Sequence, residues 1–424
     1  MILLLSRCFY PDVEGGGHNL ATLACSLGRS FPMEVVCGRS YTGVDQLGYQ
    51  SYDGLRILRV PHTRFPKKWK LGRIANWITF CISAAVACLA LRPSLLFVQT
   101  DPPILGILSV ILSRLIRCQI ILNCRDLYPD VAIELGIVRR TWLVRFFDFL
   151  NNIAYREARA TVALGEDMAR RIAAKGVPHE KLIVIPNTVD TTEIVPIQRS
   201  ENPYVRSLGL SSRFTIMYSG NIGLTQDFDT FLRAVAQIPT CRSRWLLLLA
   251  GEGAARSTLE TTLKDLNLLE NTILLPSQPR ESLGAFLGAG SLHVVPMKKG
   301  LQGCVVPGKV YTIMAAGRPY LAVCERGCDI ASLAMREGCG MWAEAGNVEL
   351  VRNSLTWAID HPQEIEVMGR KAREVAVSQF DTEIEIRQWH SLFQSVLDTH
   401  PPKPRARPSS NTGSPKPTLD SKAG

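Results

Sequence analysis

Two hydrophobic patterns alternate along the chain. Short runs that are apolar throughout, such as MILLLSRC at residues 1–8, alternate with segments in which apolar residues recur at helical spacing. Leu20, Leu23, Ala24 and Leu27 show this second pattern. Continuously apolar runs predict strands buried on both faces, and the 3.6-residue spacing predicts helices. Strands that alternate with helices predict an α/β fold, with a parallel sheet between two helical layers.

The predicted strands fall into two sets, separated by a polar, proline-bearing segment at residues 194–203. The first set comprises 1–8, 33–38, 55–61, 94–99, 119–123, 160–164 and 181–185, and the second comprises 214–218, 245–250, 272–275, 291–295, 320–323 and 340–343. We therefore expect two Rossmann-like, doubly wound domains at residues 1–195 and 205–375. We assign residues 376–399 to a C-terminal helix and 400–424, rich in proline, serine and lysine, to a disordered basic tail.

Length and composition agree with a globular protein of two domains. The chain has 424 residues, more than one hydrophobic core usually supports, of which 46% are apolar and 20% charged. Its twelve cysteines lie mostly inside apolar segments and never form a CxxC pair. This arrangement predicts buried thiols in a reducing cytoplasm rather than disulfides or a zinc site. The first residues lack the basic segment of a secretory signal and are interpreted as a strand.

The net charge of +10 is partly a property of the C-terminal tail. From His400 onward there are five basic residues (403, 405, 407, 416 and 422) and one acid, Asp420, so about +6 remains for the preceding residues. A moderate basic excess suits anionic ligands or a lipid surface. No basic-aromatic ribbon or DNA-binding motif is present, so we expect no nucleic-acid partner.

Residues 64–91 combine basic, aromatic and apolar side chains. Five basic residues surround Phe65 and Trp69 within 64–73, and an apolar run of about fourteen residues follows at 78–91. This run is shorter than the roughly 20 residues that span a bilayer, and we expect a buried helix. Basic and aromatic residues beside an apolar helix are typical of peripheral contact with anionic headgroups. The candidates for this contact are Lys67, Lys68, Trp69 and Lys70, and a solvated loop is the alternative.

A loop that opens onto a small-residue helix supplies the first candidate site. Pro307 and Gly308 mark the loop, a helix is expected over 310–316, and Gly317 is expected to end it. Lys309 adds a formal charge where a helix start presents unpaired N–H groups. This pattern predicts an anion site for a phosphate ester. An ordinary turn with a solvated lysine is the alternative.

Other loops that follow predicted strands also carry small or polar residues. Glycines 15–17 follow the first strand, Asp126 follows strand 119–123, and the loops at 219–226, 250–253 and 296–300 follow strands of the second set. Since the carboxyl ends of parallel strands share one edge of a sheet, the loops of each domain should converge where open α/β sheets bind ligands. A flexible turn is the alternative for the glycines, and capping of the next helix is the alternative for Asp126.

Taken together, these motifs resemble the retaining glycosyltransferases of family 4, which have the GT-B fold. The resemblance spans about residues 1–398 and is greatest to the branch that builds colanic acid, O-antigen and capsule. The residues that carry it are Tyr10-Pro11 with Gly15 to Gly17, QTDPP at 99–103, RDLYP at 125–129, VIPN at 184–187, YSGNIG at 218–223 with Gln226, AGEG at 250–253, and PGK at 307–309 with MAAGRP at 314–319.

The resemblance implies two facing domains around a central cleft. A nucleotide-diphosphate sugar would be held mainly by the second domain and the acceptor by the first, and a helix at about 382–398 would cross back to the first domain. Asp126 would lie beside the reacting sugar and Lys309 at the sugar-diphosphate end, as the candidate catalytic pair. The implied donor-binding residues are Gly16, Gly17, Asn221, Gly223, Gln226, Glu252, Gly253, Pro279, Lys309 and Thr312.

No metal and no other cofactor is expected. Asp227-Phe228-Asp229 has the letters of a DxD metal motif, but it opens a predicted helix, where aspartates serve as N-cap and first-turn acid. Backbone amides and a cation can stabilise a departing diphosphate without a metal. For a retaining enzyme with no obvious nucleophile, the resemblance implies same-face attack, with a diphosphate oxygen as the base.

The chain departs from the family pattern at four positions. Many members have arginine and lysine where this chain has Asn221 and Gln226, and two glutamates where it has Cys304 and Thr312. The phosphate charge would then be met by other cations. Lys309, Lys298 and Lys299 are the candidates.

The resemblance thus implies a hexosyl- or N-acetylhexosaminyl-type transferase in cell-surface polysaccharide biosynthesis. Its acceptor would be a lipid-linked or polysaccharide precursor, and the protein would be cytoplasmic with peripheral contact at the inner face of the plasma membrane. Two alternatives stay open. A nucleotide-sugar 2-epimerase would need more acids and histidines than His18 and His293 at the predicted edges, and a catalytically silent scaffold would bind nucleotide or lipid only.

Overall fold

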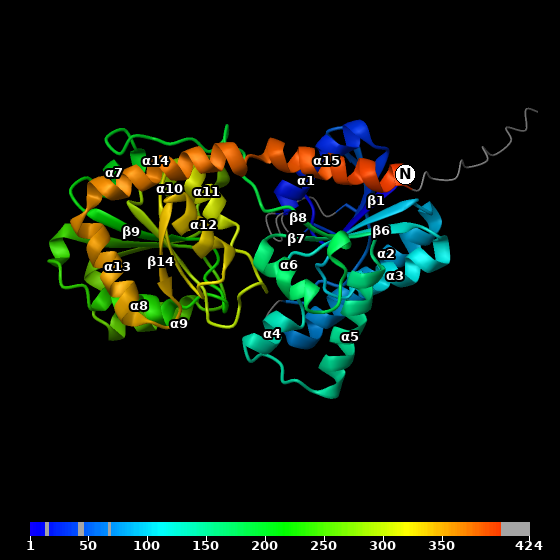
Figure 1. Ribbon diagram of the computed structural model, residues 1–424, viewed down its shortest axis with the longest axis horizontal. Coiled ribbons are helices and arrows are strands. Elements are labelled where there is room, and N and C mark those ends of the chain that lie inside the picture. The colour runs from blue at the N-terminus through cyan, green and yellow to red at the C-terminus, as the bar shows by residue number, and fades with distance from the viewer. Residues whose placement is uncertain (13–16, 41–45, 67–68, 400–424) are drawn as a thin grey trace, which may run out of the picture.

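The computed structural model describes residues 1–12, 17–40, 46–66 and 69–399. It consists of two α/β domains joined by a linker and by a long C-terminal pair of helices (Figure 1). The tail at 400–424 lies outside the described residues. Each domain contains one sheet with helices on both faces.

The first sheet has eight strands in the order β3-β4-β2-β1-β5-β6-β7-β8. They are β1 (Ile2–Ser6), β2 (Met33–Cys37), β3 (Gly48–Tyr52), β4 (Leu55–Arg59), β5 (Leu95–Gln99), β6 (Gln119–Asn123), β7 (Ala160–Ala163) and β8 (Leu182–Val184). Every residue of β1, β2 and β5 is buried, as expected for strands between two helical layers.

One strand was not predicted. β3 pairs antiparallel with β4 at the edge of the sheet, so the first sheet is not wholly parallel. Its sequence GYQSY alternates between half-buried and exposed positions. An edge strand with one solvent-exposed face needs no continuous apolar run, so β3 lacks the pattern that marked the other strands.

Helices α2 (Lys70–Leu91), α3 (Leu105–Ile116), α5 (Trp142–Glu157) and α6 (Glu166–Ala173) cover one face of this sheet. Helices α1 (Gly17–Ser30) and α15 (Thr382–Thr399) cover the other, and the short α4 (Asp130–Glu134) follows β6. Short 3-10 turns lie at His179–Lys181, Arg242–Arg244, Leu269–Asn271 and Arg280–Ser282.

The prediction of a buried helix at 78–91 was wrong in both length and exposure. The helix is α2, 22 residues long, and only one side of it, through Phe80, Ala84 and Cys88, packs on the sheet. Ile78, Ile82 and the residues in line with them face outward and are exposed. In the described part of the chain, this one helix has the length and apolar composition to cross a bilayer.

The second sheet is fully parallel, in the order β11-β10-β9-β12-β13-β14. Its strands are β9 (Phe214–Ser219), β10 (Trp245–Ala250), β11 (Thr272–Leu275), β12 (Leu292–Pro296), β13 (Tyr320–Cys324) and β14 (Gly340–Glu344). α8 (Phe228–Ala236), α9 (Arg256–Asp265) and α13 (Val348–Asp360) cover one face, and α7 (Pro203–Ser207), α10 (Leu283–Gly288), α11 (Lys309–Ala315), α12 (Asp329–Glu337) and α14 (Pro362–Gln379) cover the other.

The C-terminal helices join the two domains. The chain leaves α14 on the second domain, and α15 then packs on the first (Figure 1). Where the chain crosses, Val189 forms a parallel bridge with Asp381. Val189 N donates to Phe380 O (3.0 Å), and Thr382 N donates to Val189 O (3.1 Å). Trp389 and Phe393 then pack against Phe97 of β5, tilted and edge-on respectively, with ring centroids 4.8 and 5.2 Å away. This helix fixes the second domain relative to the first.

Candidate functional site

The polar loops of the second domain converge at the carboxyl edge of its sheet. Backbone hydrogen bonds join the loop after β9 to the loop after β10, from Gly220 N to Ala250 O (3.0 Å) and from Ile222 N to Glu252 O (2.8 Å). A third, from Lys298 N to Thr225 O (2.9 Å), adds the loop after β12. The parallel strands therefore bring these segments together, as the alternation of strands and helices predicted.

Glycines allow this close approach. Gly251 has φ +143, and a Cβ there would lie 1.9 Å from Gly220 O. Gly253 has φ +154, and a Cβ there would lie 2.3 Å from Ile222 O. Any other residue at these two positions would force the loops apart.

Lys309 lies at the centre of this edge. Its Nζ is 3.9 Å from the centroid of the Tyr218 ring and would be 2.8 Å from a Cβ at Gly220. Nζ is buried and has no hydrogen-bond partner in the described structure. Burial lowers its pKa to about 7. The interpretation of Lys309 as a solvated lysine is therefore wrong.

A buried ammonium group needs compensation that this lysine does not receive from the protein. The Tyr218 ring face offers a cation–π contact, which is weaker than an ion pair. No carboxylate among the described residues lies within ion-pair distance of Nζ, and desolvating an unpaired charge is unfavourable. An anionic ligand in this position would supply the missing acceptors. By contrast, Lys298 and Lys299, the other predicted cations, are exposed.

The neutral residues predicted near the phosphates mainly hold the loop after β9. Gln226 accepts a hydrogen bond from Gly223 N (2.9 Å) and donates one to Thr225 Oγ1 (2.8 Å). Tyr218 donates its hydroxyl to Asn221 O at 2.5 Å. The side chain of Asn221 is exposed beside Gly253. Gln226 therefore does not stand in for the family's lysine, whereas Lys309 reaches the same loop from α11.

Asp126 of the first domain lies against the loop that leads to Lys309. It forms an antiparallel bridge with Val305, and Leu127 N donates to Cys304 O at 2.9 Å. The N-cap position of α4 is Pro129 and receives no side-chain cap, so the capping alternative for Asp126 is wrong. The structure thus joins both candidate catalytic residues to one interdomain loop.

The environment of Asp126 favours its protonated form. The side chain is open to solvent on one side, but the surrounding protein restricts its hydration and raises the pKa of the carboxyl to about 6. The Asp101 carboxylate adds to this rise and the Arg125 guanidinium opposes it. The carboxylate makes no hydrogen bond to another described residue, so it is available to a ligand.

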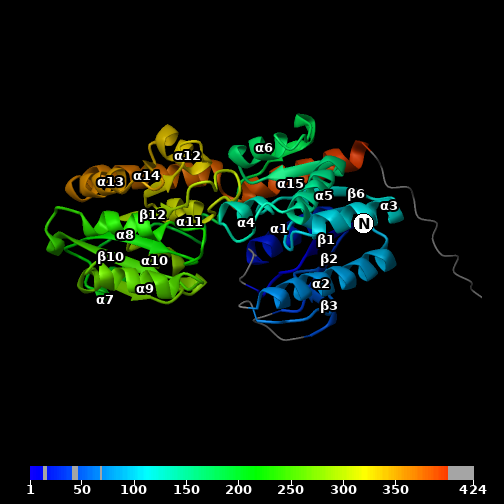
Figure 2. The same ribbon diagram turned by 90° about the horizontal axis from the view of Figure 1, so that it is seen from below.

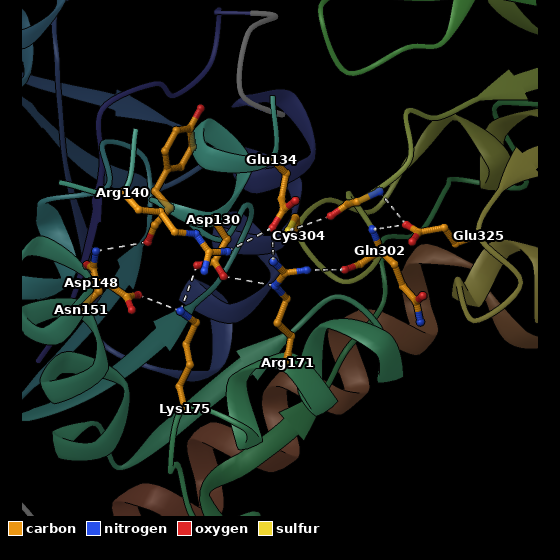
Figure 3. Close-up of polar contacts among 12 residues, drawn as sticks. Asp130, Glu134, Arg140, Asp148, Asn151, Arg171, Lys175, Gln302, Cys304 and Glu325 are labelled. Atoms are coloured by element: carbon orange, nitrogen blue, oxygen red, sulfur yellow. Dashed lines mark hydrogen bonds and ion pairs between the residues drawn. The ribbon is translucent and has the colours of Figure 1, made fainter. Parts of the chain in front are cut away.

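Asp130 and Glu134, one turn beyond Asp126, serve a different purpose. Arg171 contacts Asp130 at 3.1 Å and Glu134 at 3.3 Å, and donates to Gln302 O at 3.0 Å (Figure 3). Lys175 contacts Asp130 at 2.9 Å and Asp148 at 2.7 Å. This network ties α4, α5 and α6 of the first domain to the loop at 300–304 of the second, and so holds the segment that leads to Lys309.

The segment around Pro279, one of the implied donor-binding residues, lies near the start of α1. Arg280, next to Pro279, pairs with Glu193 of the linker at 2.7 Å. The pKa of His18 in the first domain is lowered, mainly by burial and then by the Arg280 charge. These three residues therefore mark a second place where the domains face each other.

The remaining predicted residues are dispersed. Glu252 is exposed and pairs with Arg256 at 3.4 Å, and Thr312 is half-buried one turn beyond Lys309. Gly17 begins α1, where a Cβ would lie 2.4 Å from Asp12 O. Trp69 is exposed and packs edge-on against Phe65, with centroids 4.8 Å apart. Gly16, Lys67, Lys68 and the side chain of Lys70 lie outside the described residues.

A buried polar cluster at the carboxyl edge of the first sheet was not predicted from the sequence. Glu385 of α15 accepts hydrogen bonds from Thr188 Oγ1 and from Trp389 Nε1 (3.3 Å). It lines a small pocket together with Arg125, Gln99 and other polar residues. Thr188 follows the quoted VIPN motif, but nothing in the sequence pairs it with a residue almost 200 positions later.

No group of three or more histidine, cysteine, aspartate or glutamate side chains is placed to hold a metal ion within the described ranges. The pair Asp227 and Asp229 sits at the start of α8, where Asp227 accepts from Thr230 N and Asp229 occupies the first turn. This confirms their predicted roles at the helix start.

Comparison with protein-family models assigns each domain. Residues 14–188 match the glycosyl transferase 4-like domain, and residues 204–375 match the glycosyl transferases group 1 model. The first match includes β2 to β8 but not β1, the second includes β9 to β14, and both leave α15 outside.

Two curated relatives are similar over most of the chain. The chain is 24% identical over 322 residues to "Probable glycosyltransferase WbjE" of Pseudomonas aeruginosa, covering 75% of this chain and 78% of the relative. It is 24% identical over 286 residues to "Putative colanic acid biosynthesis glycosyl transferase WcaI" of Escherichia coli strain K12, covering 66% and 68%.

Solved structures show the fold. A sucrose-phosphate synthase from Thermosynechococcus elongatus superposes with a TM-score of 0.75 at 16% identity, covering 94% of this chain and 99% of that one. Anabaena HepE, crystallised with UDP and glucose, gives 0.69 at 16% identity, covering 93% and 99%. The two Rossmann-like domains form the GT-B fold, as predicted.

Proposed function

We propose that this chain, a glycosyltransferase built from a glycosyl transferase 4-like domain and a group 1 glycosyl transferase domain, transfers a sugar from a nucleotide-diphosphate donor with retention of anomeric configuration. The acceptor in this proposal is a lipid-linked or polysaccharide-precursor saccharide. The observation that carries the proposal is the buried, unpartnered Lys309 Nζ, at the end of the loop that Asp126 contacts through its bridge with Val305.

The donor diphosphate would lie against the second domain. Its oxygens would accept from Lys309 Nζ and from backbone amides of the loops after β9 and β10, which approach each other through glycine. Charge-assisted hydrogen bonds of this kind are about twice as strong as neutral ones. The site needs no metal in this proposal, because amides and the ammonium group together stabilise the departing charge.

The reaction would break the bond between the anomeric carbon and the diphosphate oxygen and form a bond from that carbon to an acceptor oxygen. The proton of the acceptor hydroxyl passes to the departing diphosphate oxygen on the same face of the sugar. In this proposal Asp126 would orient that hydroxyl and stabilise positive charge on the ring. With a pKa of about 6, its carboxyl is mostly ionised at neutral pH.

The relatives support a role in cell-surface polysaccharide synthesis, since one of them is named for colanic acid biosynthesis. The HepE structures contain UDP, which supports a nucleotide in the cleft. We propose a hexosyl or N-acetylhexosaminyl donor, and a cytoplasmic protein that contacts the inner face of the plasma membrane peripherally, where lipid-linked acceptors are found.

Incubation of the purified protein with a panel of radiolabelled nucleotide sugars and a membrane-lipid extract tests the proposal. Labelled glycolipid is the expected product, and it should be lost with Lys309→Met and Asp126→Asn but kept with the matched exposed control Lys298→Ala. Donor binding without product from any acceptor would support a silent scaffold. Conversion of the donor to its 2-epimer without transfer would support the epimerase. Either result would overturn the proposal.

A further inference from the structure

One face of the first domain exposes large apolar side chains on three neighbouring helices. Twelve such residues on α2, α3 and α5 each expose between 42% and 74% of their surface. They are Leu71, Ile74, Ile78, Ile82, Val86 and Leu89 of α2, Ile111 and Leu115 of α3, and Trp142, Leu143, Phe146 and Phe149 of α5. We call this set the apolar face.

The three helices present this face in one direction. α2 packs beside α3 and α3 beside α5, on the same side of the first sheet (Figure 2). Along α2 the exposed residues Ile74, Ile78, Ile82 and Val86 recur every four positions, so they form one stripe opposite the buried side. At the start of α5, Trp142, Phe146 and Phe149 form a second stripe with helical spacing.

This surface differs from that of an ordinary soluble domain. Monomeric proteins rarely expose a contiguous apolar patch beyond a few hundred Å². In the second domain, exposed apolar residues such as Leu269, Met335 and Val377 stand singly on separate elements. The apolar face therefore needs a covering partner.

The charge around the apolar face points to an anionic partner. By sequence, residues 63–99 contain six basic residues and no acid, and of their described side chains Arg73 lies on α2 and Arg92 at its C-terminal end. Further arginines lie at the ends of α3 and before or within α5, at 114, 117, 139, 140 and 145. Of these, Arg114 and Arg140 have acidic neighbours, Glu157 at 3.4 Å and Glu134 at 3.7 Å. Apolar side chains rimmed by cations match a bilayer with anionic headgroups.

We propose that the apolar face docks on an anionic phospholipid bilayer, with α2 and the start of α5 inserted into its surface and no segment crossing it. α2 cannot leave the sheet to span the bilayer without exposing the core that Phe80, Ala84 and Cys88 fill. A second copy of the chain is a poorer occupant. In a two-fold dimer the same basic rim would meet itself and repel.

Docking in this orientation would bring the cleft to the headgroup layer. The amino ends of α2 and α3 follow β4 and β5, and α5 follows β6 through α4. Because these strands are parallel, those ends lie at the sheet edge that carries Asp126. A lipid-linked acceptor would then reach the cleft without leaving the membrane. The docking deepens the membrane contact of the proposed function by naming its surface, and this last consequence rests on the proposed transfer reaction as well.

Flotation of the full chain with vesicles tests the docking. Wild type should float with vesicles that contain about 30% phosphatidylglycerol, and less with neutral phosphatidylcholine or in high salt. Trp142→Ser/Phe146→Ser/Phe149→Ser should lower partitioning by about tenfold or more, because three aromatic side chains no longer insert. Ile78→Ser/Ile82→Ser/Val86→Ser, on a different helix, should act alike. The matched control Leu269→Ser/Met335→Ser/Val377→Ser should float like wild type.

A second readout guards against misfolding and tests insertion directly. Lipids brominated in the acyl chain should quench wild-type tryptophan fluorescence, and Trp142→Phe should lose part of that quenching while still floating. Wild type that does not float, or floating unaffected by both triple variants, would overturn the inference. So would a dimer in free solution that these variants convert to monomer. Nucleotide binding, measured in the same samples by calorimetry without vesicles, reports on the proposed function separately.

Discussion

The two domains share one architecture but differ in what they expose to their surroundings. The second domain keeps its key cation, Lys309, out of water at the strand ends, while its outer helices are polar. The first domain leaves its key acid, Asp126, open to solvent, while α2, α3 and the start of α5 are apolar on their outer sides. A shared fold therefore does not decide function. The loops of the second domain suit a charged small molecule, and the surface of the first suits a larger, partly lipidic one.

The largest expected effect comes from the open acid. Asp126→Asn should lower turnover by about 10²- to 10⁴-fold, the range for a group that handles a proton or stabilises developing charge in the transition state. Thermal stability and donor affinity should stay close to wild type, because the carboxylate makes no hydrogen bond in the described structure. Steady-state kinetics with the identified donor and acceptor measure this.

The matched control for that variant is Asp130→Asn, four residues away. It removes a carboxylate that lies between Arg171 and Lys175, so it should lower the melting temperature more than Asp126→Asn does. If Asp126→Asn retained full activity, Asp126 would have no role in the chemistry.

Removal of the buried cation, Lys309, should weaken ligand binding, whereas removal of Asp126 should not. Lys309→Met should weaken nucleoside diphosphate binding by about 10- to 100-fold, since a hydrogen bond to a charged group contributes roughly 1.5–3 kcal/mol. It should also leave stability unchanged or higher, because it removes an unpaired buried charge. Calorimetry and thermal unfolding of the same sample check both. Unaltered affinity would refute the assignment of Lys309.

Two glycines offer a further test of the role of Lys309 in binding. A Cβ at Gly220 (φ +129) would lie 2.8 Å from Lys309 Nζ, whereas one at Gly209 (φ +64) would meet nothing within 4 Å. Both alanine variants carry a backbone penalty for positive φ, about 1–2 kcal/mol in the left-handed region of Gly209 and a larger one at Gly220, whose φ lies outside that region. Only Gly220→Ala should also weaken nucleotide binding, by about tenfold, because it displaces the ammonium group. Equal binding by the two variants would contradict this.

The smallest expected effect is on the pH dependence of donor binding. With a pKa of about 7, Lys309 is half protonated at pH 7 in the free protein and mostly neutral at pH 8. Binding that requires the charged form should weaken by about fivefold between these pH values and should take up a proton at pH 8. Titrations at pH 8 in HEPES and in Tris should therefore give different apparent enthalpies. Identical enthalpies would show that no proton is taken up.

The same shift has a consequence for stability. Because the folded pKa of Lys309 lies below its ordinary value of 10.5, the unfolded chain binds more protons between about pH 7 and 10.5. The contribution of Lys309 to stability therefore rises as pH rises through that window. Lys309→Met should remove this part of the pH dependence.

Much of the fold could be predicted because the strands are buried on both faces. Apolar runs such as MILLLSRC mark these strands directly. The edge strand β3, with the polar sequence GYQSY, has no such run and was therefore missed. The exposure of α2 could not be predicted. A helix that is apolar on its outer side gives the same pattern as one that is buried all round, and periodicity alone does not tell them apart.

The site was predictable to the level of loops rather than contacts. Parallel strands bring the loops of each domain to one edge of its sheet, so the positions of Asp126 at the edge of the first sheet and of Lys309 at the edge of the second followed from the sequence. The placement of Nζ against Gly220 and Tyr218 depends on how α11 packs, and the use of Asp130 in an ion-pair network depends on Arg171 and Lys175 of a later helix. Contacts of this kind depend on how distant segments pack, so no local sequence pattern predicts them.

The most direct test of this account is a structure with a nucleoside diphosphate bound. We expect a diphosphate oxygen within hydrogen-bonding distance of Lys309 Nζ, at the loops after β9 and β10, with Asp126 facing the vacant sugar position. A diphosphate bound elsewhere in the cleft, with Lys309 still over the Tyr218 ring and without a partner, would contradict it.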